Sequence, residues 1–211
     1  MKVILEILES LYPNPTTALI HSNPYELLVA TILSAQCTDE RVNMITPALF
    51  VAYPTPQDLA EASFAEVASY IKTAGLWQTK TRNLIKTAQL LVTEHGGQVP
   101  KTREELEALP GVGRKTASVV LANAFGIPAI AVDTHVFRVA NRLGLAKATT
   151  TYQTELQLME VIPQEKWIDA HHWLILHGRA LCKARKPQCQ NCPLKPHCAY
   201  AQSNSSSDVL S

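Results

Sequence analysis

Four of the five cysteines in this 211-residue chain lie within 17 residues near its C-terminus. Spacers of six, two and five residues separate Cys182, Cys189, Cys192 and Cys198. Four thiolates so close in sequence match the ligand sets of tetrahedral zinc and of a [4Fe-4S] cluster. Zinc folds more often use two C-x2-C knuckles, so this spacing favours iron-sulfur while zinc stays open. The intervening KARKPQ places Lys183, Arg185 and Lys186 on a turn suited to phosphate contact or to simple solvation.

A second chemical motif is LPGVGRKTA at residues 109–117. Pro110 stops the preceding helix, while Gly111 and Gly113 permit a turn with positive φ and uncovered N–H groups. A new helix starts at once, and its free N–H groups and dipole form an anion site. The pattern predicts a helix-hairpin-helix that binds a DNA backbone, and the alternative is an ordinary helical hairpin. The residues expected to contact DNA here are Gly111, Val112, Gly113 and Thr116.

Lys115 and Asp133 are the candidates for covalent chemistry. Lys115 falls in the first turn of the helix after the glycines, where partial desolvation would disfavour its ammonium form and leave a nucleophilic amine. Asp133 follows an apolar run and precedes a helical pattern, so it is expected to cap that helix. The same carboxylate can stabilise positive charge on a sugar or act as a general base.

The composition bounds the class of protein. Hydrophobic residues make up 46% and charged residues 18% of the chain, which predicts a globular fold rather than a disordered one. The net charge is only +1, but residues 166–198 hold six Lys and Arg against the single acid Asp169, so any binding of nucleic acid must be local. No signal peptide or membrane span is expected, and the predicted compartment is the cytoplasm, at the nucleoid if the source is bacterial. Cysteines in such a reducing compartment point to metal rather than disulfides.

Helical periodicity dominates the chain, and an all-α architecture is predicted. The first helix spans the apolar positions from Val3 to Leu11, and the second starts at NPYELL, where Asn23 is the expected N-cap. The remaining predicted helices cover residues 39–51, 64–73, 79–94, 102–108, 114–125, 133–143, 151–161 and 166–181. The polar tail, from about residue 202 to 211, is expected to be disordered.

Four motifs in order, LSAQ at 33–36, LPGVGRKTA at 109–117, VDTHVFRV at 132–139 and the cysteine array, resemble the endonuclease III family of base-excision-repair glycosylases. The resemblance implies two helical domains with a DNA-binding cleft between them. One is a six-helix domain over residues 17–127 that contains the hairpin at about 104–125. The other is an iron-sulfur cluster domain over residues 1–16 and 128–211, with its cluster loop at 182–198.

The same resemblance implies roles for single residues. Lys115 matches the nucleophile that attacks C1′ of the damaged nucleotide, expels the base and forms a Schiff base, and Asp133 matches the carboxylate that assists it. Gln36 resembles the residue that fills the space of the flipped base. Leu76 resembles a wedge between bases, although a core leucine is the alternative. The implied cofactor is a [4Fe-4S] cluster, and the implied partner is duplex DNA with a damaged base or abasic site, bound by a monomer.

Two further functions stay open. Mismatch-specific glycosylases of the same superfamily share the hairpin and the cysteine array, but they usually lack a lysine at the position of Lys115 and carry a further C-terminal domain. Here Lys115 is present and the sequence ends 13 residues after Cys198, which favours a bifunctional glycosylase and lyase acting on oxidised pyrimidines. The other alternative is a non-catalytic DNA-binding or redox iron-sulfur protein.

Overall fold

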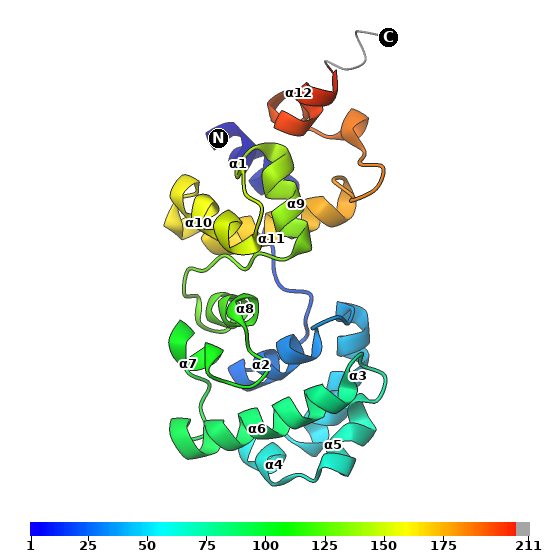
Figure 1. The fold of residues 1–211 in the computed structure, drawn as a ribbon, viewed down its shortest axis with the longest axis vertical. Helices are drawn as coiled ribbons and strands as arrows, with labels where there is room; N and C mark the ends of the chain where they lie inside the picture. The colour runs from blue at the N-terminus through cyan, green and yellow to red at the C-terminus, as the bar shows by residue number, and fades with distance from the viewer. Residues whose placement is uncertain (206–211) are drawn as a thin grey trace. The chain divides into compact units, whose positions relative to one another are not determined.

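The computed structural model describes residues 1–205, and within that range the regular structure is entirely helical. The α-helices are α1 (Lys2–Leu11), α2 (Pro24–Leu33), α3 (Asp39–Ala52), α4 (Pro56–Glu61), α5 (Phe64–Ile71), α6 (Trp77–His95), α7 (Arg103–Glu107), α8 (Arg114–Phe125), α9 (Thr134–Leu143), α10 (Thr151–Val161), α11 (Trp167–Ala180) and α12 (Ala199–Ser205). Three short 3-10 helices lie between the later α-helices: η1 (Gln164–Lys166) before α11, and η2 (Cys189–Asn191) and η3 (Lys195–His197) before α12. The all-α prediction is therefore confirmed, and Figure 1 shows the helices in chain order.

The chain divides into two compact units. Unit 2 is the contiguous stretch Thr17–Ile127, and unit 1 joins Met1–Thr16 to the residues from Pro128 onward. Unit 1 thus takes helices from both ends of the chain, and α1 packs against α11. Among residues 1–205, no helix combines the length and the apolar character needed to cross a membrane.

Unit 2 contains seven α-helices, α2 to α8, rather than the six expected from the sequence. The additional one is α4, whose six residues are too short to show a helical period. Local caps define it instead, because Thr55 and Asp58 form a reciprocal capping box and Pro56 occupies the first turn. The long helix α6 packs against α4 and α5, while α8 packs against α2.

Unit 1 surrounds an apolar core to which α1 contributes Ile4, Leu5 and Leu8. Trp173 of α11 is 1% exposed and donates its indole N–H to the carbonyl of Tyr12 at 3.1 Å. Lys166 contacts Glu9 of α1 at 2.7 Å. These contacts hold the N-terminal helix against the C-terminal half of the chain.

The predicted helix ends agree with the structure to within two residues, but the predicted tail does not. Residues 202–205, which were expected to be disordered, belong to α12. The hydrophobic core of unit 1 includes Ala201, which anchors this helix. The rest of the predicted tail, residues 206–211, lies outside the described residues.

Candidate functional site

The hairpin predicted at LPGVGRKTA is formed by α7 and α8. Gly111 has φ +80°, and a Cβ added there would lie 2.7 Å from the side-chain nitrogen of Asn83. Gly113, however, has φ −101° and ψ −179°, an extended conformation open to any residue. The prediction of positive φ at both glycines was therefore wrong for Gly113. The turn is tied to α6 because Thr87 donates its hydroxyl to the carbonyl of Pro110 at 3.0 Å.

Helix α8 begins without a side-chain cap. Gly113 is its N-cap residue and supplies no side-chain acceptor, whereas α7 is capped by Thr102, whose hydroxyl accepts from the Glu105 N–H. The first-turn N–H groups of α8 and the positive end of its dipole are thus available to an outside anion. Val112 is 6% exposed and anchors the turn in the core, while Thr116 is half-buried.

Arg103 fixes the start of α8 from the facing helix. Its guanidinium donates to the Ser118 hydroxyl at 3.0 Å and to the carbonyl of Arg114 at 3.4 Å. The Ser118 hydroxyl itself donates to the same Arg114 carbonyl at 3.0 Å. These bonds join α7 to the helical turn that carries Lys115.

Lys115 is exposed at the surface of unit 2. The sequence argument assumed partial desolvation of its ammonium, and the folded chain does not provide that burial. An exposed lysine beside uncapped N–H groups is nevertheless accessible to a substrate that those groups hold. Any desolvation at Lys115 must then come from the bound molecule.

Asp133 caps α9, as predicted. One carboxylate oxygen, Oδ1, accepts from the N–H groups of His135 and Val136, each at 2.8 Å. Two charge-assisted bonds hold that oxygen in place, and the residue as a whole remains half-buried. The capping role of Asp133 is thus observed directly.

The next turn of α9 connects Asp133 to the cysteine loop. Arg138 donates to the carbonyls of Gly178 and Cys182, each at 3.1 Å, and contacts the His135 ring nitrogen at 3.2 Å. Burial lowers the pKa of His135, and the nearby Asp133 carboxylate opposes this shift. His135 therefore packs in a polar junction within unit 1. Among the described residues it belongs to no group of three or more His, Cys, Asp or Glu side chains that could hold a metal ion.

Gln36 and Leu76 lie in two loops that pack together in unit 2. Both residues are exposed and both adopt the left-handed conformation, with φ +53° and +58°. A Cβ added at Gly75 would lie 3.2 Å from the carbonyl oxygen of Gln36, so the two backbones are in close contact. Leu76 is 58% exposed, which excludes the core-leucine alternative.

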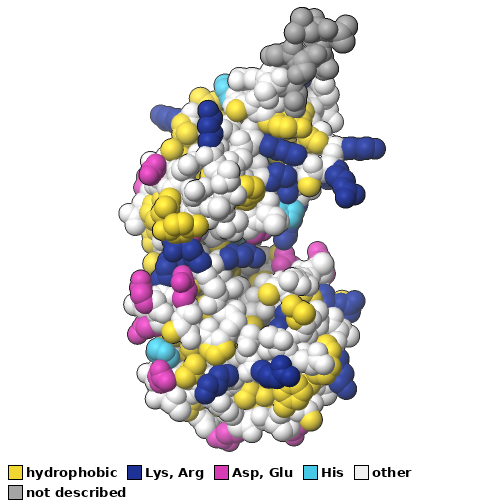
Figure 2. All heavy atoms as spheres, viewed as in Figure 1, with side chains coloured by type: hydrophobic (Ala, Val, Ile, Leu, Met, Phe, Trp, Pro, Cys, Tyr) yellow, Lys and Arg dark blue, Asp and Glu magenta, His cyan; other side chains and the backbone are white. Residues whose placement is uncertain are grey.

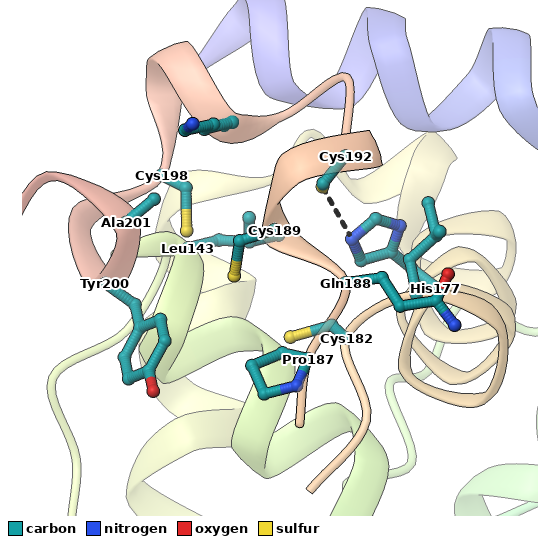
Figure 3. Close-up of a pocket in the computed structure, with 12 residues that line it drawn as sticks. Leu143, His177, Cys182, Pro187, Gln188, Cys189, Cys192, Cys198, Tyr200 and Ala201 are labelled. Atoms are coloured by element: carbon teal, nitrogen blue, oxygen red, sulfur yellow. Dashed lines mark hydrogen bonds between the residues drawn. The ribbon is translucent and has the colours of Figure 1, made fainter. Parts of the chain in front are cut away.

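The four C-terminal cysteines line one pocket, shown in Figure 3. The thiols of Cys182, Cys189 and Cys198 point toward a common space, while that of Cys192 points toward His177. The Cys192 sulfur lies 3.6 Å from His177 Nε2. The four thiols are arranged around a pocket, and no three His, Cys, Asp or Glu side chains in residues 1–205 surround a single metal position.

The surroundings of this pocket fit a group that binds thiolates. The Arg142 guanidinium lies 3.5 Å from the Cys182 sulfur and donates to the carbonyls of Lys183 and Ala184 at 2.7 and 3.1 Å. The Tyr200 ring packs 4.7 Å from the same guanidinium. Burial raises the pKa of the Cys192 and Cys198 thiols, so a bound cationic metal group is what would keep them as thiolates.

The cluster loop between the first two cysteines is exposed. Lys183, Arg185 and Lys186 all lie at the surface, and Lys186 has φ +52°. Basic side chains project from the surface seen in Figure 2. Arg142 binds two carbonyls of the cluster loop, so the backbone of the loop has a defined path. The basic side chains of the loop are exposed and can reach outward.

Sequence reasoning missed four residues that the structure places at these sites. Arg142 and His177 contact the cysteines, Arg103 supports the hairpin, and Lys80 is a buried lysine that bonds the carbonyl of Leu33, three residues before Gln36. For His177 the signal was its place five residues before Cys182. The other three contact partners at least 11 positions away in sequence, and no local pattern marks such pairs.

Comparisons with known proteins agree with this arrangement. Residues 29–164 match the HhH-GPD superfamily base excision DNA repair protein family, and residues 182–198 match the iron-sulfur binding domain of endonuclease III. Endonuclease III of Haemophilus influenzae is 51% identical over 199 residues, covering 94% of each chain.

Two solved structures are also similar to this chain. One is a trapped endonuclease III–DNA covalent intermediate, with TM-score 0.91, 44% identity and coverage of 97% of this chain and 96% of that one. The other is a non-covalent endonuclease III–DNA complex, with TM-score 0.92 at the same identity and coverage. Identity at this level over nearly the whole chain, together with both domain matches, establishes that the chain belongs to the endonuclease III family within the HhH-GPD superfamily.

Proposed function

We propose that this chain removes oxidised pyrimidines from duplex DNA, with Lys115 as the nucleophile and Asp133 as the assisting carboxylate. Membership of the family makes it a DNA glycosylase and abasic-site lyase that carries a [4Fe-4S] cluster. The observation that carries the residue assignment is an exposed lysine in the first turn of a helix whose N–H groups have no side-chain cap. A solved relative that forms a covalent intermediate with DNA supports a nucleophilic residue in this fold.

The proposed reaction begins when the neutral amine of Lys115 attacks C1′ of the damaged nucleotide. A bond forms between Nζ and C1′, the glycosidic bond breaks, and the base leaves with its bonding electron pair and takes up a proton. The nitrogen gives up one proton, the C1′–O4′ bond then breaks, and O4′ takes up a proton as the sugar ring opens to a protonated imine. Loss of a proton from C2′ then expels the 3′ phosphate by β-elimination, which nicks the strand.

Asp133 serves this chemistry through the negative charge of its carboxylate. The two backbone bonds to Oδ1 hold that charge in a fixed position. A preorganised carboxylate stabilises positive charge on the sugar as the base departs, and it favours transfer of a proton from the lysine ammonium. Capping α9 and assisting the reaction use the same group without conflict.

Binding of the duplex is assigned to backbone and basic groups. The hairpin, with Gly111, Val112, Gly113 and Thr116, offers N–H groups to a phosphate, and the cluster loop offers Lys183, Arg185 and Lys186. Gln36 fills the space left when the damaged base leaves the stack, and Leu76 enters between neighbouring bases. Since the substrate is chromosomal DNA, we place the enzyme in the cytoplasm, at the nucleoid if the source is bacterial.

Cys182, Cys189, Cys192 and Cys198 are proposed as the ligands of the cluster. The cluster supplies four soft metal sites that join the thiolates into one rigid loop. Arg142 donates toward the Cys182 sulfur and to a loop carbonyl, and His177 Nε2 lies 3.6 Å from the Cys192 sulfur. Their part is to hold the loop so that its basic side chains face the phosphates.

Borohydride trapping on an abasic duplex tests the catalytic assignment, because only an enzyme that forms an imine is crosslinked. Wild-type protein should crosslink, and Lys115→Gln should not, while both keep the same melting temperature and the same iron content. Lys86→Gln, which changes an exposed lysine on α6, is the matched control and should crosslink like the wild type. Crosslinking by Lys115→Gln would show that another amine is the nucleophile.

The trapping assay and a comparison of excision rates together separate the alternatives. A non-catalytic redox protein would bind the duplex without any crosslink. A mismatch-specific enzyme would release a normal base from a mispair in preference to thymine glycol from a matched duplex. Excision of thymine glycol at the faster rate supports the proposed substrate class.

A further inference from the structure

Lys80 is a buried lysine that the proposed reaction does not use. Its side chain is 4% exposed, and its ammonium donates to the carbonyl of Leu33 at 2.8 Å. Burial lowers its pKa, and in residues 1–205 no ion pair with a carboxylate is formed at this ammonium. Burying a charged group is costly, so a lysine at this position calls for a structural reason.

The first reason lies at the C-terminal end of α2. The Ala30 and Thr31 carbonyls there accept bonds from the Ser34 N–H and hydroxyl groups. The carbonyl of Leu33, the last residue of the helix, accepts from Lys80 instead. A cation at the negative end of the helix dipole is favourable, and it fixes the point at which the chain leaves α2 toward Gln36.

The second reason lies on α6, the helix to which Lys80 belongs. The Lys80 N–H donates to the carbonyl of Leu76 at 3.0 Å and so closes the first turn behind that residue. Lys80 therefore contacts the last residue of α2, where the Gln36 loop begins, with its side chain and the turn of Leu76 with its backbone. Those two loops also touch directly, since Gly75 packs against the Gln36 carbonyl.

Both loops hold strained residues in exposed positions. A non-glycine residue with positive φ persists only where its surroundings determine its conformation, and neither Gln36 nor Leu76 is fixed by its own exposed side chain. Lys80 is a buried residue whose ammonium bonds the end of α2 that leads to Gln36 and whose backbone N–H bonds the turn of Leu76. It is thus placed to hold them in one geometry.

We propose that Lys80 is a positioning residue that locks the Gln36 and Leu76 loops into a single rigid element, so that both side chains enter a damaged duplex together. This inference rests on the proposed function, because it takes Gln36 and Leu76 as the residues that enter the duplex. Lys80 itself touches no DNA in this arrangement. Its effect should appear in selectivity for damaged over intact duplex rather than in general affinity.

A double-mutant cycle tests the proposal with full-length, cluster-loaded protein. The probes are one duplex with a tetrahydrofuran abasic analogue and the same duplex without it. The measured quantity is the selectivity ratio, which is the dissociation constant for the intact duplex divided by that for the abasic duplex. Lys80→Met and Leu76→Ala should each lower this ratio by about tenfold or more, and the double variant should fall little below the worse single variant, as coupled residues do. Lys86→Met, an equal substitution at an exposed position on the same helix, should leave the ratio unchanged.

Hydrogen exchange distinguishes a local loosening of the two loops from a general loss of stability, because the two raise the exchange rates of different amides. In Lys80→Met the amides of Ser34 and Cys37 should exchange faster while those of α8 and α9 keep their protection. Lys80→Gln, whose amide can still donate a hydrogen bond, should show the same changes to a smaller extent. If Lys80→Met does not fold, Lys80→Gln decides the cycle.

The outcomes separate this inference from the proposed function. If wild-type protein neither prefers the abasic duplex nor crosslinks under borohydride, the proposed function fails. If the wild type does both and the Lys80 variants keep its selectivity, or lose it additively with Leu76→Ala, the positioning role is overturned. Exchange that rises equally throughout the chain would also overturn it, since Lys80 would then serve only global stability.

Discussion

The two glycines of the hairpin should respond in opposite ways to the same substitution. Alanine at Gly111 must adopt φ +80°, which costs about 1–2 kcal/mol for a residue with a Cβ. It also brings a carbon to 2.7 Å from the Asn83 amide, and displacing that side chain adds roughly 0.5–1.5 kcal/mol. Gly111→Ala should therefore destabilise unit 2 by about 2–3 kcal/mol.

Alanine at Gly113 meets neither obstacle. The backbone there is extended, and nothing lies within 4 Å of the added Cβ. Gly113→Ala should keep or raise stability, by about 0.4–1 kcal/mol, because the unfolded chain loses freedom. The new methyl group nevertheless sits beside the uncapped N–H groups of α8, so binding of an abasic duplex should weaken.

Thermal melts followed by circular dichroism, run beside binding titrations, measure both effects. For a chain of this size Gly111→Ala should melt about 5–10 °C below the wild type. Adding Asn83→Ala should recover the part of the loss that comes from the contact and leave the part that comes from φ. Equal drops in melting temperature for the two glycine variants would refute the conformational argument, and unchanged DNA binding by Gly113→Ala would refute the phosphate site.

Three further outcomes are expected. Asp133→Asn keeps a capping side chain but removes the charge, so the melting temperature should hold while single-turnover excision of thymine glycol falls by about 10² or more; unaltered excision would reduce Asp133 to a cap. Replacing Lys183, Arg185 or Lys186 by alanine should lower the slope of log affinity against log salt by roughly 0.9 for each lost phosphate contact, equally on all sequences; an unchanged slope would leave these side chains merely solvated. Burial lowers the pKa of His172 to about 4, so the unfolded state binds the extra proton and stability should fall as the pH drops from about 6.5 toward 4; denaturant unfolding of His172→Gln should show a shallower fall in stability across that window.

The features that the sequence predicts correctly are those written in short stretches of chain. Pro110 and Gly111 mark the hairpin turn because they restrict or free the backbone locally, and Asp133 is recognisable as a cap from the helix that follows it. The cysteine array is equally local. Helix α4 escapes prediction because six residues carry no periodic signal, although Thr55 and Asp58 do carry a capping pattern.

Other features depend on partners far apart in the chain. Nothing near Lys80 in the sequence indicates that its ammonium meets Leu33, which lies 47 positions away. Arg142 likewise reaches loop carbonyls 41 and 42 positions beyond it. Exposure is a property of the folded chain as well, which is why the sequence could not decide whether Leu76 belongs to the core.

Unit 1 is built from both ends of the chain, and this bears on the order of events during synthesis. Unit 2 is contiguous and leaves the ribosome complete once residue 127 has emerged, whereas α1 must wait for Trp173 before its buried face is covered. We expect unit 2 to fold first and α1 to remain exposed through most of translation. The four clustered cysteines, Cys182 to Cys198, emerge after all of unit 2 and most of unit 1, so the protein takes up its cluster only after nearly all of its remaining structure can form.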